Sequence, residues 1–157
     1  MVNCTFENGN KASLRHVVID AIILRQNSIL MVKRSEKIIE GGKWGLVGGY
    51  VERDETLEQA LLREVLEETG YSLKKQDFFT IIDNPKRKNE DRQNIAFVYV
   101  CEVGEKIGNP DWESTEQKWF ELTNLPKEVE IAFDHLRIIN LYLLNKGNKH
   151  KLISYKK

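Results

Sequence analysis

Cysteine, long apolar runs and an excess of charge of one sign are all scarce in this 157-residue sequence. The two cysteines, Cys4 and Cys101, are far apart, and neither has a CxxC or CxxH partner. A disulfide framework or a zinc site is therefore not expected, and a reducing, cytoplasmic compartment fits best. No apolar run approaches the roughly 20 residues of a membrane span, and the polar N-terminus lacks the apolar segment of a signal peptide.

The charged residues balance, with 24 Lys and Arg against 24 Asp and Glu. A net basic field that would attract nucleic acid or an anionic membrane is missing, and neither partner is expected. The length suits one domain with a sizeable core. We predict a single domain over residues 1–157, in which residues 1–13 form a loose leader and residues 146–157 a basic tail.

Apolar segments predict strands interrupted by two helices. Residues 16–24 are nearly all apolar, which is typical of a strand with both faces covered. Further strands are expected at 29–33, 44–47, 73–83, 93–102 and 116–122, and helices at 56–69 and 134–145. This order indicates an α+β fold or a three-layer α/β/α sandwich.

The helix expected at residues 56–69 has local signals at both ends. Thr56 and Gln59 have the spacing of a capping box, although Asp54 is a rival N-cap. Gly70 is a natural C-terminal stop. Between these ends an apolar stripe would face the core, formed by Leu61, Leu62, Val65 and Leu66.

Three carboxylates border that apolar stripe. At about 100° per residue, Glu64, Glu67 and Glu68 fall within roughly a third of the helix circumference. Glu64 and Glu68 are like charges four residues apart, which costs about 0.2–0.5 kcal/mol on an exposed helix and more once the site loses water. Arg63 can reach Glu67 and relieve part of the repulsion. A divalent cation such as Mg²⁺, which prefers oxygen ligands, would relieve more. A solvated acidic helix face is the alternative.

The spacing of glycine, glutamate and arginine over residues 49–71 favours a metal site over a solvated acidic face. Gly49, five residues, Glu55, seven residues and then the run R-E-V-L-E-E-T-G-Y from Arg63 to Tyr71 resemble the signature of the Nudix hydrolases. Every fixed Gly, Glu and Arg of that signature is matched. Tyr71 departs from it where an aliphatic residue is usual, and Val47 departs where the family often has proline. Neither position carries the chemistry.

The resemblance implies a mixed central sheet with flanking helices, and a phosphoanhydride hydrolase that uses Mg²⁺, with Mn²⁺ as the alternative. Glu64 and Glu68 would be the principal metal ligands, and Glu67 would share or support them. The carbonyl of Gly48 is a further expected ligand. A bound metal neutralises developing charge and lowers the pKa of a bound water.

Other residues are expected to support this chemistry. By the same resemblance, Glu55 and Arg63 would hold the helix and orient its carboxylates. Some Nudix enzymes take the general base from inside the signature, which points to Glu64. Others use a glutamate on a loop outside it, and here Glu113 and Glu116 are the candidates.

Three residues outside the signature are candidate substrate contacts. Arg34 follows the second strand, where family members often carry an arginine that meets phosphate. Trp44 either packs in the core or stacks on a base. Arg87 belongs to a group of loop cations that either reach substrate phosphates or form a solvated hairpin tip. His16 and His135 lack metal-ligand spacing and are expected to be structural or surface residues.

Two short segments bear on the substrate. Residues 131–135, I-A-F-D-H, and residues 83–85, D-N-P, look like segments of ADP-ribose pyrophosphatase-type members, although Asp134 equally suits a helix N-cap. The expected substrate is therefore a nucleoside diphosphate linked to a second group, ADP-ribose or a nucleotide sugar first. An oxidised nucleoside triphosphate pyrophosphohydrolase and a non-catalytic, nucleotide-sugar-binding regulatory module are the alternatives. Family members of this type are often dimers, which implies a homodimer.

Overall fold

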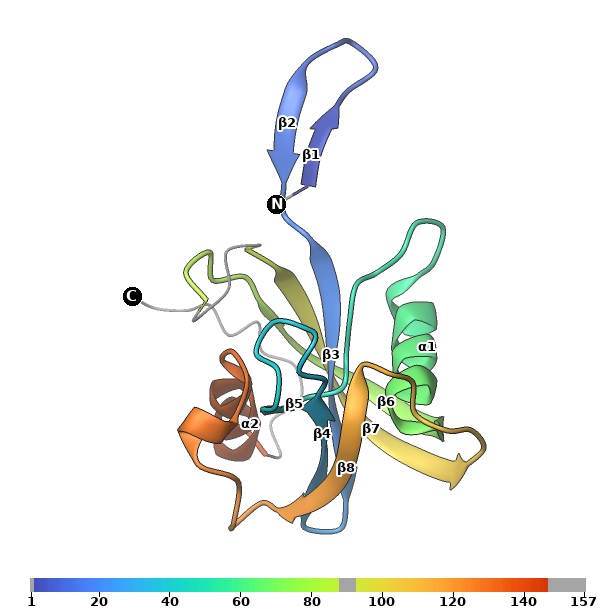
Figure 1. The fold of residues 1–157 in the computed structure, drawn as a ribbon, viewed down its shortest axis with the longest axis vertical. Coiled ribbons are helices and arrows are strands. Elements are labelled where there is room, and N and C mark those ends of the chain that lie inside the picture. The colour runs from blue at the N-terminus through green and yellow to red at the C-terminus, as the bar shows by residue number, and fades with distance from the viewer. Residues whose placement is uncertain (1, 88–92, 147–157) are drawn as a thin grey trace.

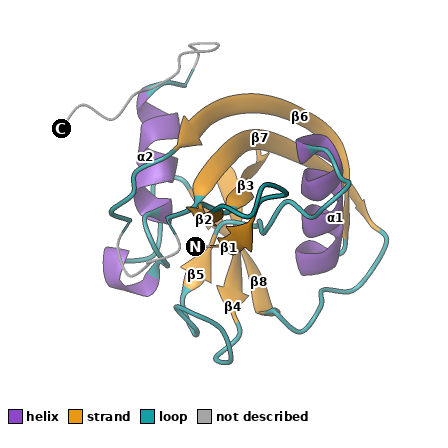
Figure 2. Ribbon diagram, turned by 90° about the horizontal axis from the view of Figure 1, so that it is seen from above, coloured by secondary structure: helices purple, strands orange, loops and turns teal. Residues whose placement is uncertain are grey.

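A mixed β-sheet between two helices forms the body of the protein, in a computed structural model that describes residues 2–87 and 93–146. Helices α1 (Leu57–Thr69) and α2 (His135–Leu144) flank the sheet on opposite sides (Figure 1, Figure 2). The predicted α+β sandwich is confirmed. Its strands are β3 (Val17–Arg25), β4 (Ser28–Arg34), β5 (Trp44–Gly45), β6 (Tyr71–Ile82), β7 (Ile95–Lys106) and β8 (Ser114–Glu121), and a short 3-10 turn, η1 (Glu128–Glu130), precedes α2.

The sheet is ordered β5-β4-β3-β7-β6, and β8 pairs with β4. Strands β3 and β7 run parallel, from the pair Val17 and Ile95 to the pair Ile23 and Cys101. The other pairings in this sheet are antiparallel. Because β3 has neighbours on both edges and a helix over each face, it needs the nearly continuous apolar sequence that it has.

Side chains of β3 alternate between two apolar clusters. Val18 and Ile22 belong to the cluster that contains the buried apolar residues of α2. Ile19 and Ala21 belong to the cluster that contains those of α1. Since successive side chains of a strand point to opposite faces, Asp20 is directed to the α2 face. The central strand therefore places one carboxylate beneath α2.

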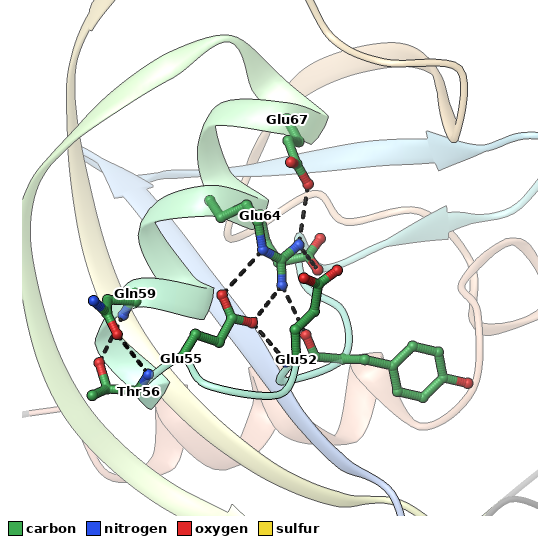
Figure 3. Close-up of polar contacts among 8 residues, drawn as sticks. Glu52, Glu55, Thr56, Gln59, Glu64 and Glu67 are labelled. Carbon is green, nitrogen blue, oxygen red and sulfur yellow. Dashed lines mark hydrogen bonds and ion pairs between the residues drawn. The ribbon is translucent and has the colours of Figure 1, made fainter.

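Helix α1 begins and ends where its local signals predict. Thr56 is the N-cap: its side chain accepts from the Gln59 N–H at 3.2 Å, and the Gln59 side chain accepts from the Thr56 N–H at 2.8 Å (Figure 3). Gly70 ends the helix in a left-handed conformation with φ of 73°, and its N–H donates to the Leu66 carbonyl at 2.8 Å. Asp54 is therefore not the cap.

Residues 2–14 form a hairpin in the region where we expected a loose leader. Strands β1 (Val2–Thr5) and β2 (Lys11–Leu14) pair in an antiparallel hairpin that extends away from the sandwich (Figure 1). The turn signal was present in the sequence as the dipeptide Asn8-Gly9, and Gly9 has φ of 83° with its N–H donating to the Phe6 carbonyl at 2.8 Å.

Other predicted boundaries shift by a few residues. Strands β6 and β7 extend over 12 residues each, because their long antiparallel pairing continues past the predicted ends. Most of the basic tail expected at 146–157, and the loop cations after Arg87, lie outside the described residues. Within the described part of the chain, neither helix is long and apolar enough to cross a membrane.

Replacing Gly70 by alanine should destabilise the fold more than the same change at Gly42. Both glycines have a left-handed φ, 73° and 74°, so alanine strains the backbone at either position by about 1–2 kcal/mol. A Cβ at Gly70 would also overlap the Gly108 carbonyl, whereas at Gly42 it meets only the flexible end of Glu36. Denaturant unfolding followed by circular dichroism measures both losses, and equal losses would contradict the contact with Gly108.

Candidate active site

A cavity of about 550 Å³ is lined by residues of α1, of the loops beside it and of the segment that leads into α2. Its volume is typical of sites for small molecules. One group of lining residues, called the acidic side below, consists of Glu64, Glu67, Asp111 and Glu113. A second group, the cationic side, consists of Arg34, Lys37 and Arg87. The cavity therefore offers carboxylates for a cation and cations for phosphate groups.

The backbone of Gly48 and Gly49 passes beside the acidic side. The Gly48 N–H donates to Oε2 of Glu68 at 3.0 Å, and the Gly49 carbonyl accepts from the Ile19 N–H at 2.9 Å. A Cβ at Gly48 would overlap the Ile19 carbonyl, and one at Gly49 would overlap the Glu64 carboxylate. Glycine is required at both positions because strand β3 and helix α1 approach the segment from either side.

Arg63 binds two carboxylates of the acidic side, Glu64 and Glu67, together with Glu55. Its guanidinium donates to Glu55 at 2.7 and 3.2 Å, to Glu64 at 2.8 Å and to Glu67 at 3.1 Å. A further bond goes to the Tyr50 carbonyl at 2.9 Å. Figure 3 shows Glu55 in the loop before α1, and Glu64 and Glu67 on the helix, with their carboxylates directed toward this guanidinium. The predicted pairing of Arg63 with Glu67 is confirmed, and the contacts with Glu55 and Glu64 fit the expected orienting role.

Burial raises the pKa of both Glu64 and Glu68. Desolvation raises the pKa of Glu68 well above its usual value, and the hydrogen bond from the Gly48 N–H only partly opposes it. Desolvation also raises the pKa of Glu64, against the hydrogen bond from Arg63. The pKa of Glu55, by contrast, is lowered by its bond to Arg63. The hydrogen bonds that Glu64 and Glu68 accept thus only partly offset the cost of burying their charge.

The chemistry of these donors fits a hard divalent cation. A cation beside Glu64 and Glu68 would stabilise the charged carboxylates that burial disfavours. Arg63 pairs directly with Glu55, Glu64 and Glu67, and among the described contacts none joins it to Glu68. Within residues 2–87 and 93–146, however, no three His, Cys, Asp or Glu side chains are gathered closely enough to hold a metal on their own. The metal-ligand roles of Glu64, Glu67, Glu68 and the Gly48 carbonyl therefore stay predictions.

The loop between β7 and β8 brings two more carboxylates to the cavity. It is tied to the end of α1 by backbone bonds: the Gly108 N–H donates to the Gly70 carbonyl at 3.0 Å, and the Asp111 N–H donates to the Glu67 carbonyl at 2.8 Å. Glu113 is half-buried and lines the cavity. Glu116, the other candidate base, is exposed on β8, is not among the lining residues and lies 3.8 Å from the Lys33 ammonium.

The candidate substrate contacts divide between the cavity and the core. Arg34 lines the cavity, and its guanidinium lies over the Phe133 ring at 5.0 Å from the centroid. Trp44 instead packs edge-to-face on Phe120, 4.9 Å between centroids, against the apolar cluster under α2. Among the described lining residues Trp44 is absent, so the structure favours the core interpretation over base stacking.

Arg87 is buried, so a solvated hairpin tip is wrong for this residue. Its Nε donates to Oδ1 of Asp134 at 3.0 Å, and a terminal nitrogen lies 4.0 Å from Oδ2 of Asp20. Asp134 precedes α2 but makes no side-chain cap bond; its carboxylate accepts from Arg87. His135 Nε2 lies 3.8 Å from Oδ1 of Asp20. These four side chains, of which Asp134 is half-buried and the others buried, form a polar cluster that joins the cationic side at Arg87.

Sequence reasoning missed Asp20 and set aside His135, although both line the cavity. One signal for Asp20 was available, since a lone carboxylate inside an otherwise apolar, doubly covered strand is rarely buried without a partner. No comparable signal existed for His135, because its neighbours come from residues 20, 46 and 87.

Glutamine at position 68 should stabilise the metal-free protein near neutral pH. A carboxyl with a raised folded pKa binds more protons folded than unfolded, so its contribution to stability falls as pH rises from about 4.3 through the folded pKa. Glu68→Gln removes that cost and keeps an acceptor for the Gly48 N–H. Thermal unfolding in a chelator should show the variant melting above the wild type at about pH 7.5, with a smaller difference at about pH 5. A variant that melts lower at both pH values would contradict the burial of an unpaired charge.

Comparison with known proteins gives independent evidence. Residues 14–142 match the family described as NUDIX domain. The ADP-ribose pyrophosphatase of Methanocaldococcus jannaschii is 37% identical over 129 residues, which are 81% of this chain and 72% of that protein. The MutT NUDIX hydrolase of Burkholderia pseudomallei has a TM-score of 0.71 at 27% identity, over 82% of this chain and 98% of that one. The NUDIX domain of Shewanella oneidensis NrtR, solved with ADP ribose, has a TM-score of 0.70 at 25% identity, over 86% and 90% of the two chains.

These matches extend well beyond the signature around α1. They include the sheet, both helices and the cavity-lining segments before and after them. The resemblance noted from Gly49, Glu55 and the run from Arg63 to Tyr71 is thereby confirmed, and the chain belongs to the NUDIX domain family of hydrolases.

Proposed function

We propose that this protein is a divalent-metal-dependent pyrophosphohydrolase that cleaves a nucleoside diphosphate linked to a second group, with ADP-ribose as the first substrate. The observation that carries this proposal is a pair of carboxylates against the Gly48–Gly49 backbone. Glu64 lines the cavity and is bound by Arg63, and Glu68, buried one turn further along α1, accepts from the Gly48 N–H. Family membership gives the reaction type, since relatives are named as pyrophosphatases.

The remainder of the cavity supports a substrate with phosphate groups at its centre. Arg34 and Lys37 line the same cavity as the carboxylates and supply positive charge for phosphate oxygens. Phe133 and Ile39 add apolar surface beside them. A second cavity of about 360 Å³ shares Arg87 and Phe133 with the first and leaves room for a second sugar.

The chemistry divides between the bound cation and the residues of this chain. The cation, Mg²⁺ first and Mn²⁺ next, would neutralise charge on the pyrophosphate oxygens and lower the pKa of a water. Glu64 and Glu68 would hold it, and Arg63 would keep Glu64 and Glu67 oriented. A carboxylate at the cavity would take the proton of the attacking water. Attack on one phosphorus of ADP-ribose gives AMP and ribose 5-phosphate.

The substrate preference within this family comes from contacts outside the shared signature. The relative from M. jannaschii is named an ADP-ribose pyrophosphatase, and the NrtR domain was solved with ADP ribose. Both names favour a diphosphate substrate for this chain. A nucleoside triphosphate pyrophosphohydrolase would instead release inorganic pyrophosphate and a nucleoside monophosphate. Residence in the cytoplasm and assembly as a homodimer stay predictions beside this proposal.

A substrate competition tests the proposal. ADP-ribose, a nucleotide sugar and 8-oxo-dGTP are mixed at equal concentration with Mg²⁺, and the products are separated by chromatography. We expect the highest kcat/KM for ADP-ribose. In Glu64→Gln the kcat/KM for this substrate should fall by at least about 100-fold, because a charge that stabilises the transition state is removed. A much higher kcat/KM for 8-oxo-dGTP would replace the diphosphate assignment by the triphosphate one. Tight binding of ADP-ribose without turnover would instead support a non-catalytic module.

The position of Glu113 predicts that it is the better candidate for the general base outside the signature. Glu113→Gln should lower kcat by about 100-fold or more with little change in KM, in keeping with general-base catalysis. Glu116→Gln is the matched control on the same segment and should keep the wild-type rate, because Glu116 is exposed and lies near Lys33. A rate loss confined to Glu116→Gln would reverse this assignment, and full activity in both variants would point to Glu64.

A further inference from the structure

The backbone from Trp44 to Gly49 is held from two directions. On one side strand β3 binds it, with the Ala21 N–H donating to the Val47 carbonyl at 2.8 Å. On the other side lies the segment that leads into α2. The Ala132 N–H donates to the Trp44 carbonyl at 2.8 Å, and the Leu46 N–H donates to Nδ1 of His135 at 2.9 Å. Of these contacts, the bond to His135 is made by a side chain.

The His135 ring is buried and oriented by its neighbours. It is 4% exposed, and it lies against Gly45, where a Cβ would be 3.4 Å from Nδ1, about van der Waals distance. Because Nδ1 accepts a hydrogen bond, the ring proton belongs on Nε2, which faces Asp20. Burial, with the nearby Arg87 and Arg34, lowers the pKa of His135 well below its usual value. The ring therefore stays neutral, and Nδ1 stays an acceptor.

The segment that His135 fixes leads directly to the acidic side. Two residues after Leu46, the Gly48 N–H donates to Glu68 at 3.0 Å, and this bond is the only compensation of Glu68 by a hydrogen bond among the described contacts. A peptide unit is planar and nearly rigid. Only the φ and ψ angles of Leu46 and Val47 therefore separate the unit that His135 holds from the unit that carries the Gly48 N–H and the Ala21-bound Val47 carbonyl. The position of Leu46 thus affects both the N–H that binds Glu68 and the Gly48 carbonyl.

We propose that His135 is a positioning residue of the hydrolase site: its imidazole fixes the Leu46 N–H and so aims the N–H of Gly48 at Glu68 and its carbonyl at the cation. The inference rests on the proposed function of Gly48 and Glu68. It gives α2, which carries none of the signature residues, a direct role in the site.

Two substitutions separate this role from simple packing. His135→Leu removes the acceptor, whereas His135→Asn keeps a side-chain oxygen near the position of Nδ1. Ile138→Ala is the matched control, because Ile138 is fully buried in α2 and packs in the same apolar cluster as Leu46. It lowers stability without touching a hydrogen bond of the 44–49 segment.

The first measurement is hydrogen exchange of the peptide that contains Leu46 and Gly48, in metal-free protein. Exchange should become faster in His135→Leu than in Ile138→Ala, and it should return toward the wild-type rate in His135→Asn. Equal protection in His135→Leu and the wild type would overturn the proposal, because the bond would then not fix the segment. This measurement does not depend on catalysis, so it stands even if the protein hydrolyses none of the tested substrates.

The second measurement is the dependence of ADP-ribose hydrolysis on Mn²⁺. In His135→Leu the half-saturating Mn²⁺ concentration should rise and kcat should fall, each by about 10-fold or more, as for other residues that orient metal ligands. The KM for the nucleotide should change little, and His135→Asn should recover most of the loss. If Ile138→Ala shows the same loss, or if His135→Leu keeps the wild-type Mn²⁺ dependence, His135 is only a core residue. An inactive wild type would instead contradict the proposed function.

Discussion

The structure depends on keeping two glutamate carboxylates, Glu64 and Glu68, at the edge of an apolar core. Loss of water disfavours their charge, so each needs a partner fixed from elsewhere. Arg63 supplies one and is itself held by Glu55 and the Tyr50 carbonyl. The backbone of Gly48 supplies the other. The capping box, the left-handed Gly70 and the close glycine contacts all serve to set the helix against this backbone.

Strand β3 supports both sides of the cavity through its alternation. The backbone groups of Ile19 and Ala21 hold the glycine segment, and their side chains pack under α1. Asp20, between them, is directed to the other face, where Arg87 and His135 lie nearby. One short piece of central strand thus fixes the position of the acidic side relative to the cationic side.

The sequence predicted what depends on near neighbours in the chain. Thr56, Gln59 and Gly70 act within one helical turn, and the pairing of Arg63 with Glu67 spans four residues, so spacing alone was sufficient. The contact between Arg87 and Asp134 spans 47 residues, and that between Leu46 and His135 spans 89. Such contacts exist only once the sheet has formed. Which of Glu113 and Glu116 lines the cavity likewise depends on where β8 begins.

The hydrogen bonds that attach the loop between β7 and β8 to the end of α1 join main-chain atoms, at Gly70 and Glu67. Main-chain hydrogen bonds do not depend on which side chains the loop carries. The exposed side chains of Ile107 and Trp112 take no part in these bonds and can change identity without breaking them, whereas the Asp111 side chain accepts from the Glu113 N–H at 2.9 Å. Substitutions at these two positions would change the outer surface of the loop while the bonds to Gly70 and Glu67 keep its backbone in place.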